Sequence, residues 1–214
     1  MNSCPLCKSG DAFPFHEDQK RSYFRCRNCD LTFVPANFHL SRAREKAEYD
    51  LHENSPVDEG YRRFLSRIFD PLNQRLAPHS QGLDFGSGPG PTLSVMFREV
   101  EHDVHIYDPF YAADESVLKT TYDFVTATEV VEHFRVPCFE WQRMWNCVKP
   151  GGWLGIMTKL ARDREAFSKW HYKDDLTHVS FFARGTFEFL ANQWAGSLEF
   201  IGNDVILIQR AAAE

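Results

Sequence analysis

Long apolar runs are missing from this sequence of 214 residues. No stretch approaches the length of about 20 apolar residues that a helix needs to cross a bilayer. The N-terminal residues, Met1-Asn2-Ser3-Cys4-Pro5, also lack the basic and then apolar pattern of an export signal. We therefore expect a cytoplasmic protein with no membrane-spanning helix.

An excess of positive charge is missing as well. The chain carries 24 Lys and Arg residues against 30 Asp and Glu residues, which gives a formal net charge of −6. This balance disfavours attraction of the whole surface to nucleic acid or to anionic membranes, and it leaves room only for a local basic patch. With 43% hydrophobic and 14% aromatic residues, the chain can build one substantial core and a small appended module.

Cysteine is used sparingly and in a pattern. Four of the six cysteines form two Cys-x-x-Cys pairs, Cys4/Cys7 and Cys26/Cys29, which are separated by 18 residues. Two such turns present four thiolates in the tetrahedral arrangement that zinc prefers, and a closed four-sulfur shell is structural because no position stays open for substrate. The alternatives are a redox dithiol and coincidental thiols. The remaining two, Cys138 and Cys147, stand among apolar residues and are expected to pack as small hydrophobic side chains.

Composition divides the chain into three parts. We expect a zinc-ribbon module at 1–38, a helical linker or cap at 39–78 and a Rossmann-like domain at 79–214. Within the linker, residues 41–54 suit a connecting helix, and a second helix begins near Val57 with apolar residues at helical spacing. Pro71 is expected to kink or divide that second helix.

After Pro78 the chain alternates short apolar segments with helical stretches, which is typical of a parallel sheet wrapped by helices. We expect strands at 82–85, 103–108, 123–128 and 152–158. Residues 198–201 and 205–209 are separated by Gly202-Asn203-Asp204 and predict a closing antiparallel hairpin.

A glycine-rich loop follows the first of these strands, in the segment Gly82-Leu-Asp-Phe-Gly-Ser-Gly-Pro-Gly-Pro91. Glycines at this position of a strand-turn-helix unit let a ligand approach the backbone. A dinucleotide fingerprint would need a sixth-place glycine, but Pro91 stands there. Asp84 would repel a pyrophosphate, whereas it would attract a cofactor with a cationic amino group.

The next strand ends in Asp108, a position where a carboxylate can accept both ribose hydroxyls. Together with Asp84, this residue makes S-adenosylmethionine a better candidate than a nicotinamide cofactor. Because Pro109 follows, the alternative is an aspartate that only forms a turn.

The chain resembles the class I S-adenosylmethionine-dependent methyltransferases over residues 57–210, in four motifs that occur in the family's order. They are Leu83–Gly90, Tyr107-Asp108, Tyr122–His133 and Lys149–Leu154. The resemblance implies an α/β fold, a doubly wound Rossmann-like open sheet of seven strands, and members that carry an N-terminal zinc ribbon are known. It implies a cofactor site built from Asp84, Gly86, Gly88, Gly90, Asp108, Thr128 and Glu129.

Candidate catalytic residues lie in two places. Glu132 and His133 follow the fourth-strand motif, where the carboxyl ends of strands face the ligand. The long aromatic and polar segment 170–182 could form a lid over the acceptor, and it contains Asp174, Asp175 and His178; a comparable Asp-x-x-His segment lies beside the active site in the family that the chain resembles. A base is needed only if the acceptor must lose a proton, and His178 is the preferred one. The alternatives are helix capping by Glu132, packing of His133 beside Phe134, and simple pairing of Asp175 with His178.

Three functions remain open from the sequence. The first is methyl transfer to a small molecule such as a sugar nucleotide, a quinol or another metabolite. The second is an RNA methyltransferase whose ribbon binds the backbone through Lys20, Arg21, Arg25 and Arg27. The third is a non-catalytic scaffold that still binds the cofactor. The acceptor, the methylated atom and the oligomeric state do not follow from the sequence.

Overall fold

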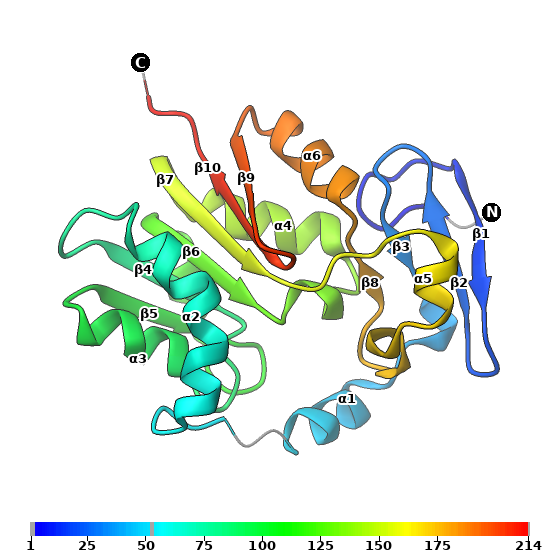
Figure 1. Ribbon diagram of the computed structural model, residues 1–214, viewed down its shortest axis with the longest axis horizontal. Coiled ribbons are helices and arrows are strands. Elements are labelled where there is room, and N and C mark those ends of the chain that lie inside the picture. The colour runs from blue at the N-terminus through cyan, green and yellow to red at the C-terminus, as the bar shows by residue number, and fades with distance from the viewer. Residues whose placement is uncertain (1–2, 52–53, 214) are drawn as a thin grey trace.

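The computed structural model describes residues 3–51 and 54–213, and it contains two sheets (Figure 1). The larger sheet has six strands in the order β5-β4-β6-β7-β10-β9, and the smaller, N-terminal sheet has the order β1-β2-β3-β8. Within this part of the chain no helix is both long and apolar enough to cross a membrane.

The six strands of the larger sheet confirm the strands expected from the sequence. They are β4 (Gln81–Phe85), β5 (Asp103–Tyr107), β6 (Tyr122–Thr128), β7 (Val148–Met157), β9 (Ser197–Ile201) and β10 (Val205–Gln209). The first four pair in parallel, whereas β10 pairs antiparallel with both β7 and β9. The predicted closing hairpin is therefore present, and the sheet is mixed.

The sheet differs in one respect from the seven strands that the resemblance implied. Between β5 and β6, residues 109–121 form a turn and the short 3-10 helix η2 (Glu115–Lys119), with no strand. A parallel strand would need a crossover of about a dozen residues on each side. The segment is too short for that, so β5 becomes the edge of a six-stranded sheet.

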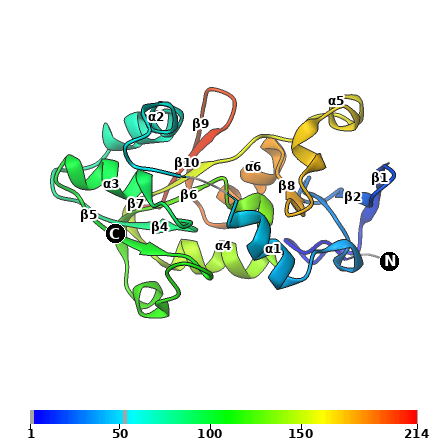
Figure 2. The same cartoon turned by 90° about the horizontal axis from the view of Figure 1, so that it is seen from below.

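Helices cover both faces of the larger sheet (Figure 2). On one face, α2 (Glu59–Asn73) and α3 (Thr92–Glu99) pack on strand residues that include Phe124 and Leu207. On the other, α4 (Pro137–Asn146) and α6 (Arg184–Gln193) pack on residues that include Val125 and Ile208. Neighbouring residues of one strand thus serve opposite cores, as the alternation of side chains along a strand requires. Buried Cys147 belongs to the second core, as expected, and Cys138 is half-buried.

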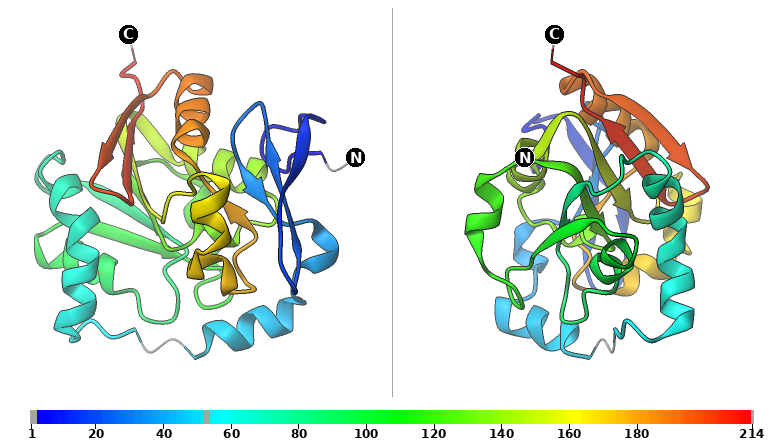
Figure 3. Two further views of the ribbon diagram at one scale, coloured as in Figure 1. Left: turned by 45° about the vertical axis from the view of Figure 1, so that its right-hand side comes forward. Right: turned by 90° about the vertical axis from the view of Figure 1, so that its left-hand side faces the viewer.

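Pro71 does not divide the second linker helix, because α2 continues through it to Asn73. The first linker helix, α1 (Arg42–Tyr49), is shorter than the predicted 41–54. Residues 52–53 of that prediction, residues 1–2 of the predicted ribbon module and residue 214 lie outside the described residues. Figure 3 shows α1 between the small sheet and α2, below the larger sheet.

The small N-terminal sheet includes one strand from a segment far along the chain. Strands β1 (Ala12–Glu17), β2 (Ser22–Cys26) and β3 (Thr32–Phe33) pair antiparallel, and β3 pairs in turn with β8 (Ser180–Phe181). Strand β8 lies within the predicted acceptor segment 170–182, which also contains the 3-10 helix η4 (His171–Asp174) and is preceded by α5 (Arg164–Ser168). The ribbon is therefore connected by backbone hydrogen bonds to the segment that carries His178.

Candidate active site

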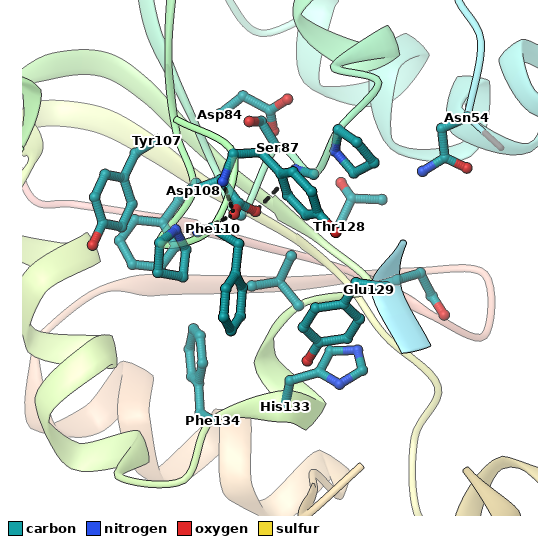
Figure 4. A pocket seen from close by; sticks show the side chains of 18 of the residues that line it. Asn54, Asp84, Ser87, Tyr107, Asp108, Phe110, Thr128, Glu129, His133 and Phe134 are labelled. Carbon is teal, nitrogen blue, oxygen red and sulfur yellow. Dashed lines mark hydrogen bonds between the residues drawn. The ribbon is translucent and has the colours of Figure 1, made fainter. Parts of the chain in front are cut away.

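One cavity of about 900 Å³ lies at the carboxyl ends of β4, β5 and β6. It brings together ten of the residues singled out from the sequence. They come from the predicted cofactor site and from both groups of candidate catalytic residues. They are Asp84, Gly86, Gly88, Gly90, Asp108, Thr128, Glu129, His133, Asp175 and His178. Figure 4 shows Asp84, Ser87 and Asp108 at one end of this cavity and His133 and Phe134 at the other.

The glycine loop bends because two of its glycines adopt left-handed backbone angles. Gly86 has φ +77° and Gly88 has φ +63°, a region that residues with a Cβ rarely adopt. The N–H of Gly86 donates to the Tyr107 carbonyl at 2.7 Å, which joins the loop to β5. Gly90 is needed for another reason, because a Cβ there would lie 2.1 Å from the carbonyl oxygen of Asn54. The linker segment therefore closes one side of the loop.

Asp108 forms the turn that the alternative interpretation expected, and it also lines the cavity. Its Oδ1 accepts hydrogen bonds from the backbone N–H groups of Phe110 (2.8 Å) and Tyr111 (3.0 Å). Its Oδ2 accepts one from the N–H of Gly88 at 3.0 Å. A carboxylate oxygen has two lone pairs, so Oδ2 keeps acceptor capacity for a ligand hydroxyl.

Asp84 is a buried carboxyl group, with 4% of the residue exposed. Burial raises its pKa to about 6, although a hydrogen bond from the Thr126 hydroxyl (2.9 Å) and the charge of Arg98 act in the opposite direction. No ion pair to Asp84 is found among the described residues. A ligand with a cationic group would therefore find an uncompensated carboxylate here.

Two hydroxyl groups along the same wall lack partners. Within the part of the chain that the structure describes, Ser87 Oγ and Thr128 Oγ1 are buried and make no hydrogen bond. Buried polar groups are normally paired, so these two hydroxyls beside the cavity are available to a bound ligand. Together with the glycine turns and the two carboxylates, they fit a cofactor that carries an amino group, hydroxyls and a purine, as S-adenosylmethionine does.

Glu129 follows β6 directly and adopts the left-handed region at φ +53°. Such backbone strain at a non-glycine residue is found most often at functional sites. Its Oε2 accepts a hydrogen bond from the Tyr172 hydroxyl at 3.3 Å, and burial raises its pKa even though Lys159 opposes the shift. The side chain thus lies between the cofactor wall and the acceptor segment.

His133 and His178 meet at the other end of the cavity, with ring centroids 4.7 Å apart. The Nδ1–H of His178 donates to the Tyr172 carbonyl at 2.7 Å, since a carbonyl oxygen can only accept. Burial lowers the pKa of His178, so the neutral ring keeps a lone pair on Nε2. Asp175 Oδ2 is 3.6 Å from that Nε2, as the pairing alternative expected. Neither residue caps α6, whose N-cap position is Ala183.

Asp175 stays ionised beside this histidine. Burial would raise its pKa, but hydrogen bonds from the Thr177 hydroxyl and N–H lower it. A neutral imidazole with an adjacent carboxylate can accept a proton and then be stabilised as a cation. This pair is the arrangement in the cavity best suited to act as a general base.

Glu132 is fully buried and is not among the residues that line the cavity. It lies inside the 3-10 helix η3 (Val131–His133) instead of capping a helix, and it accepts hydrogen bonds from the hydroxyls of Tyr172 and of Thr158 (3.0 Å). Burial, aided by the charge of Glu129, raises its pKa to about 8. The structure therefore separates Glu132 from direct contact with an acceptor, behind Tyr172.

The same residues have metal-binding chemistry. Glu132, His133 and His178 each offer one ligand atom, and these atoms lie within 4.8 Å of one another. Two imidazoles and a carboxylate form a common divalent-cation set. The sequence pointed to these residues only as acids, bases or packing groups.

Tyr172 and the helix α1 were not assigned a role from the sequence. The Tyr172 ring lies 4.2 Å from that of His178, while its hydroxyl reaches Glu129 and Glu132. From α1, Tyr49 packs edge-on to His133 at 5.2 Å, and Arg42 and Glu45 also line the cavity. An aromatic-rich segment was the only local signal for Tyr172, and nothing in the α1 sequence distinguished it from a plain connector.

The four paired cysteines converge within the N-terminal ribbon. Cys4 Sγ and Cys29 Sγ are 3.5 Å apart, as are Cys7 Sγ and Cys26 Sγ, and all four lie within 4.8 Å of one another. A tetrahedral zinc ion with bonds of about 2.3 Å places its sulfur ligands roughly 3.8 Å apart. The cluster therefore fits zinc and suggests a structural site.

The basic stretch of the ribbon is largely used inside the protein. Arg21 is buried with 2% exposed, Arg25 pairs with Asp30 at 2.6 Å, and exposed Arg27 stacks on a ring and pairs with Asp11. Lys20 is exposed, at the tip of the hairpin. This arrangement removes Arg21 from any surface that could contact a nucleic acid backbone.

Comparison with known proteins identifies a family match over much of the chain. Residues 55–194 match the family described as Methyltransferase domain. No match was found among curated protein sequences.

Solved structures share the fold at low sequence identity. A 1,6-didemethyltoxoflavin-N1-methyltransferase from Burkholderia thailandensis, solved with 1,6-didemethyltoxoflavin and S-adenosylhomocysteine, superimposes with a TM-score of 0.53 at 13% identity, over 94% of this chain and 99% of that chain. A putative methyltransferase from Bacillus halodurans gives 0.52 at 18% identity, over 64% and 67%. A SAM-dependent methyltransferase from Archaeoglobus fulgidus gives 0.51 at 14%, over 70% and 99%.

Proposed function

Since the chain belongs to the methyltransferase-domain family and is an S-adenosylmethionine-dependent methyltransferase, we propose that it methylates a small molecule bound beside His133 and His178. The observation that carries this proposal is the shared cavity. One space of about 900 Å³ contains both the glycine loop and the two histidines. Small-molecule sites measure about 300–1,000 Å³, so the cavity has the size for a cofactor and a modest acceptor.

The cofactor would lie along Asp84, the glycine loop and Asp108. Asp84 would bind its amino group, and Asp108 would accept its ribose hydroxyls. Ser87, Thr128 and Glu129 supply further polar groups on the same wall. When bound, S-adenosylmethionine supplies an electrophilic methyl group on a sulfonium.

The acceptor would lie at the histidine end, where Phe110 and Phe134 provide apolar walls. A hydroxyl or amine acceptor that must lose a proton would give it to the lone pair on His178 Nε2. The resulting imidazolium is stabilised by Asp175, and the tautomer is set by the Tyr172 carbonyl. Glu132 and Tyr172 would position His133 and His178 without touching the acceptor.

Two observations favour a small acceptor over RNA. The chain is acidic overall, and the guanidinium groups of Arg21 and Arg25 bond within the protein. The Burkholderia enzyme, which shares the fold, is also a small-molecule methyltransferase by its substrate. The cysteine cluster would hold a structural zinc ion that stabilises the ribbon.

The first experiment is calorimetric titration of the purified protein with S-adenosylmethionine, S-adenosylhomocysteine and NAD. Micromolar binding of the first two compounds alone is expected. A panel of hydroxyl and amine metabolites and a structured RNA would then be incubated with methyl-labelled cofactor, and label should enter small molecules only. Labelled RNA would support the nucleic acid alternative, and binding without any transfer would support a scaffold.

A further inference from the structure

The buried guanidinium of Arg21 connects the ribbon to the acceptor end of the cavity. Arg21 stands at the end of the β1–β2 turn, 2% exposed. Its NH2 donates to the carbonyls of Lys173 (2.5 Å) and Asp175 (2.8 Å), and its NH1 donates to that of Leu176 (3.2 Å). One ribbon side chain therefore binds three carbonyls of the segment 173–176, which is more than 150 residues away in sequence.

The segment that receives these bonds has no regular structure after η4, from Asp175 to Val179. The Asp175 carbonyl accepts one bond from within the segment, the N–H of His178 at 3.3 Å, and carbonyls without such a partner must find one outside it. Arg21 supplies those partners, because a guanidinium offers five N–H donors in a rigid plane. The segment carries both Asp175 and His178, so its backbone position determines where these side chains point.

Other hydrogen bonds, within the ribbon, hold the Arg21 guanidinium in place. Its Nε donates to the Tyr23 hydroxyl at 2.9 Å, and that hydroxyl donates to Asp18 Oδ2 at 2.9 Å. Asp18 Oδ1 accepts the backbone N–H of Arg21 at 3.0 Å, and Asp18 Oδ2 lies 3.6 Å from Lys173 Nζ. The guanidinium is therefore oriented by the ribbon before it meets the segment 173–176.

A second connection lies on the other side of His178. The N–H of Val34, which follows β3, donates to the Val179 carbonyl at 2.9 Å, and the N–H of Val179 donates to the Glu132 carbonyl at 2.8 Å. Both ends of the segment that carries His178 are thus bonded to the ribbon. The ribbon is in turn closed by the four cysteines, with Cys26 at the end of β2.

We propose that Arg21 is a positioning residue for methyl transfer, through which the cysteine ribbon holds Asp175 and His178 in place at the acceptor site. The proposal rests on the proposed function, because it takes the histidine end of the cavity as the acceptor site. It assigns the ribbon a role inside the enzyme: closing the ribbon around a metal ion orders the acceptor segment while leaving the cofactor wall, at the far end of the cavity, unaffected.

The test compares Arg21→Met and Arg21→Lys with the matched control Arg27→Met. Arg27 is exposed, and its side chain pairs with Asp11 and stacks on the Phe13 ring, both within the ribbon. Its replacement therefore removes a similar side chain without touching 173–176. Three readouts are needed: S-adenosylhomocysteine affinity by calorimetry, amide hydrogen exchange by mass spectrometry, and the ring ¹⁵N shifts of His178.

In Arg21→Met, exchange across 173–179 should accelerate by about tenfold or more, because the local opening of this segment is no longer opposed. The His178 Nδ1–H signature should be lost, while the S-adenosylhomocysteine affinity stays within about twofold and the zinc content is unchanged. Arg21→Lys should give exchange rates between those of Arg21→Met and the wild type, because a single ammonium group cannot donate from two nitrogens as a guanidinium does. Arg27→Met should match the wild type.

Wild-type exchange and wild-type His178 shifts in Arg21→Met would overturn the proposal. If Arg21→Met does not fold, Arg21→Lys decides: acceleration confined to 173–179 supports the proposal, and acceleration spread evenly over the ribbon overturns it. Failure of the wild type to bind S-adenosylhomocysteine would instead refute the proposed function, and the exchange data would still report on the Arg21 contacts.

Discussion

The Oδ2 of Asp108 accepts a hydrogen bond of 3.0 Å from the backbone N–H of Gly88, which ties the end of β5 to the glycine loop after β4. This single contact joins the two sequence features that first indicated the cofactor. It also means that Asp108 shapes the loop as well as facing the ligand.

Replacing Asp108 should weaken the binding of S-adenosylhomocysteine while leaving the fold intact. Asp108→Ala removes the ribose acceptor, so we expect a loss of affinity of about tenfold to a hundredfold, the equivalent of one hydrogen bond to a charged group worth about 1.5–3 kcal/mol. Asp108→Asn keeps Oδ1 for the turn and should lose less. The control is Asp114→Ala, an exposed residue that caps η2, and calorimetry is the measurement. Unchanged affinity in Asp108→Ala would contradict the assigned cofactor site.

Cofactor affinity should depend on pH through Asp84. The pKa of its buried carboxyl is raised to about 6, so the group is protonated below that pH and cannot attract a cationic amino group. Affinity for S-adenosylhomocysteine should be level above about pH 7 and fall by up to about tenfold per pH unit below 6. In Asp84→Asn the affinity should be weaker and nearly independent of pH between 5 and 8. A wild-type profile that does not change across pH 6 would rule out this role.

The same group should affect folding stability in the opposite direction. The folded pKa lies above the ordinary value of about 3.9, so the unfolded chain releases its proton first as the pH rises. In the absence of ligand, Asp84 should lower the free energy of unfolding as pH rises from about 4 to 6, with no further change above. Urea unfolding of the wild type and Asp84→Asn at pH 4.5 and 7 checks this, and a variant with the same pH dependence as the wild type would contradict it.

The four-cysteine cluster should bind one zinc ion that supports the ribbon. The double change Cys26→Ser with Cys29→Ser should remove this equivalent and lower the melting temperature, because structural zinc contributes directly to folding. Cys138→Ser, on half-buried Cys138 outside the cluster, serves as the control. Metal analysis is the readout. Full retention of the zinc equivalent in the double variant would disprove the cluster assignment.

Removing the imidazole of His178 should slow methyl transfer without weakening cofactor binding. A general base contributes about a hundredfold to ten-thousandfold, so His178→Gln should lower kcat by that order for hydroxyl or amine acceptors found in the screen. His171→Gln is the matched control, since His171 is exposed on the same segment and interacts with Lys159 instead. Equal kcat values for the two variants would show that His178 is not the base.

Much of the site could be read from local sequence. The alternation of apolar residues predicted six strands that the structure contains, and the glycines after β4 predicted a turn that the φ angles of Gly86 and Gly88 confirm. Paired cysteines predicted a cluster. These features depend on neighbours within a few residues, where spacing and backbone preference decide the structure.

Other features of the site could not be predicted, because they depend on contacts between segments far apart in the chain. The family motifs, the cofactor loop and the cysteine cluster are each encoded in a short run of residues, so they could be predicted without the structure. Only the folded chain placed Glu132 behind Tyr172, away from the cavity, and brought β3 beside β8. Only the folded chain turned Arg21 from an apparent surface cation into a buried donor to Lys173, since burial is set by what packs over a residue and not by its neighbours in sequence.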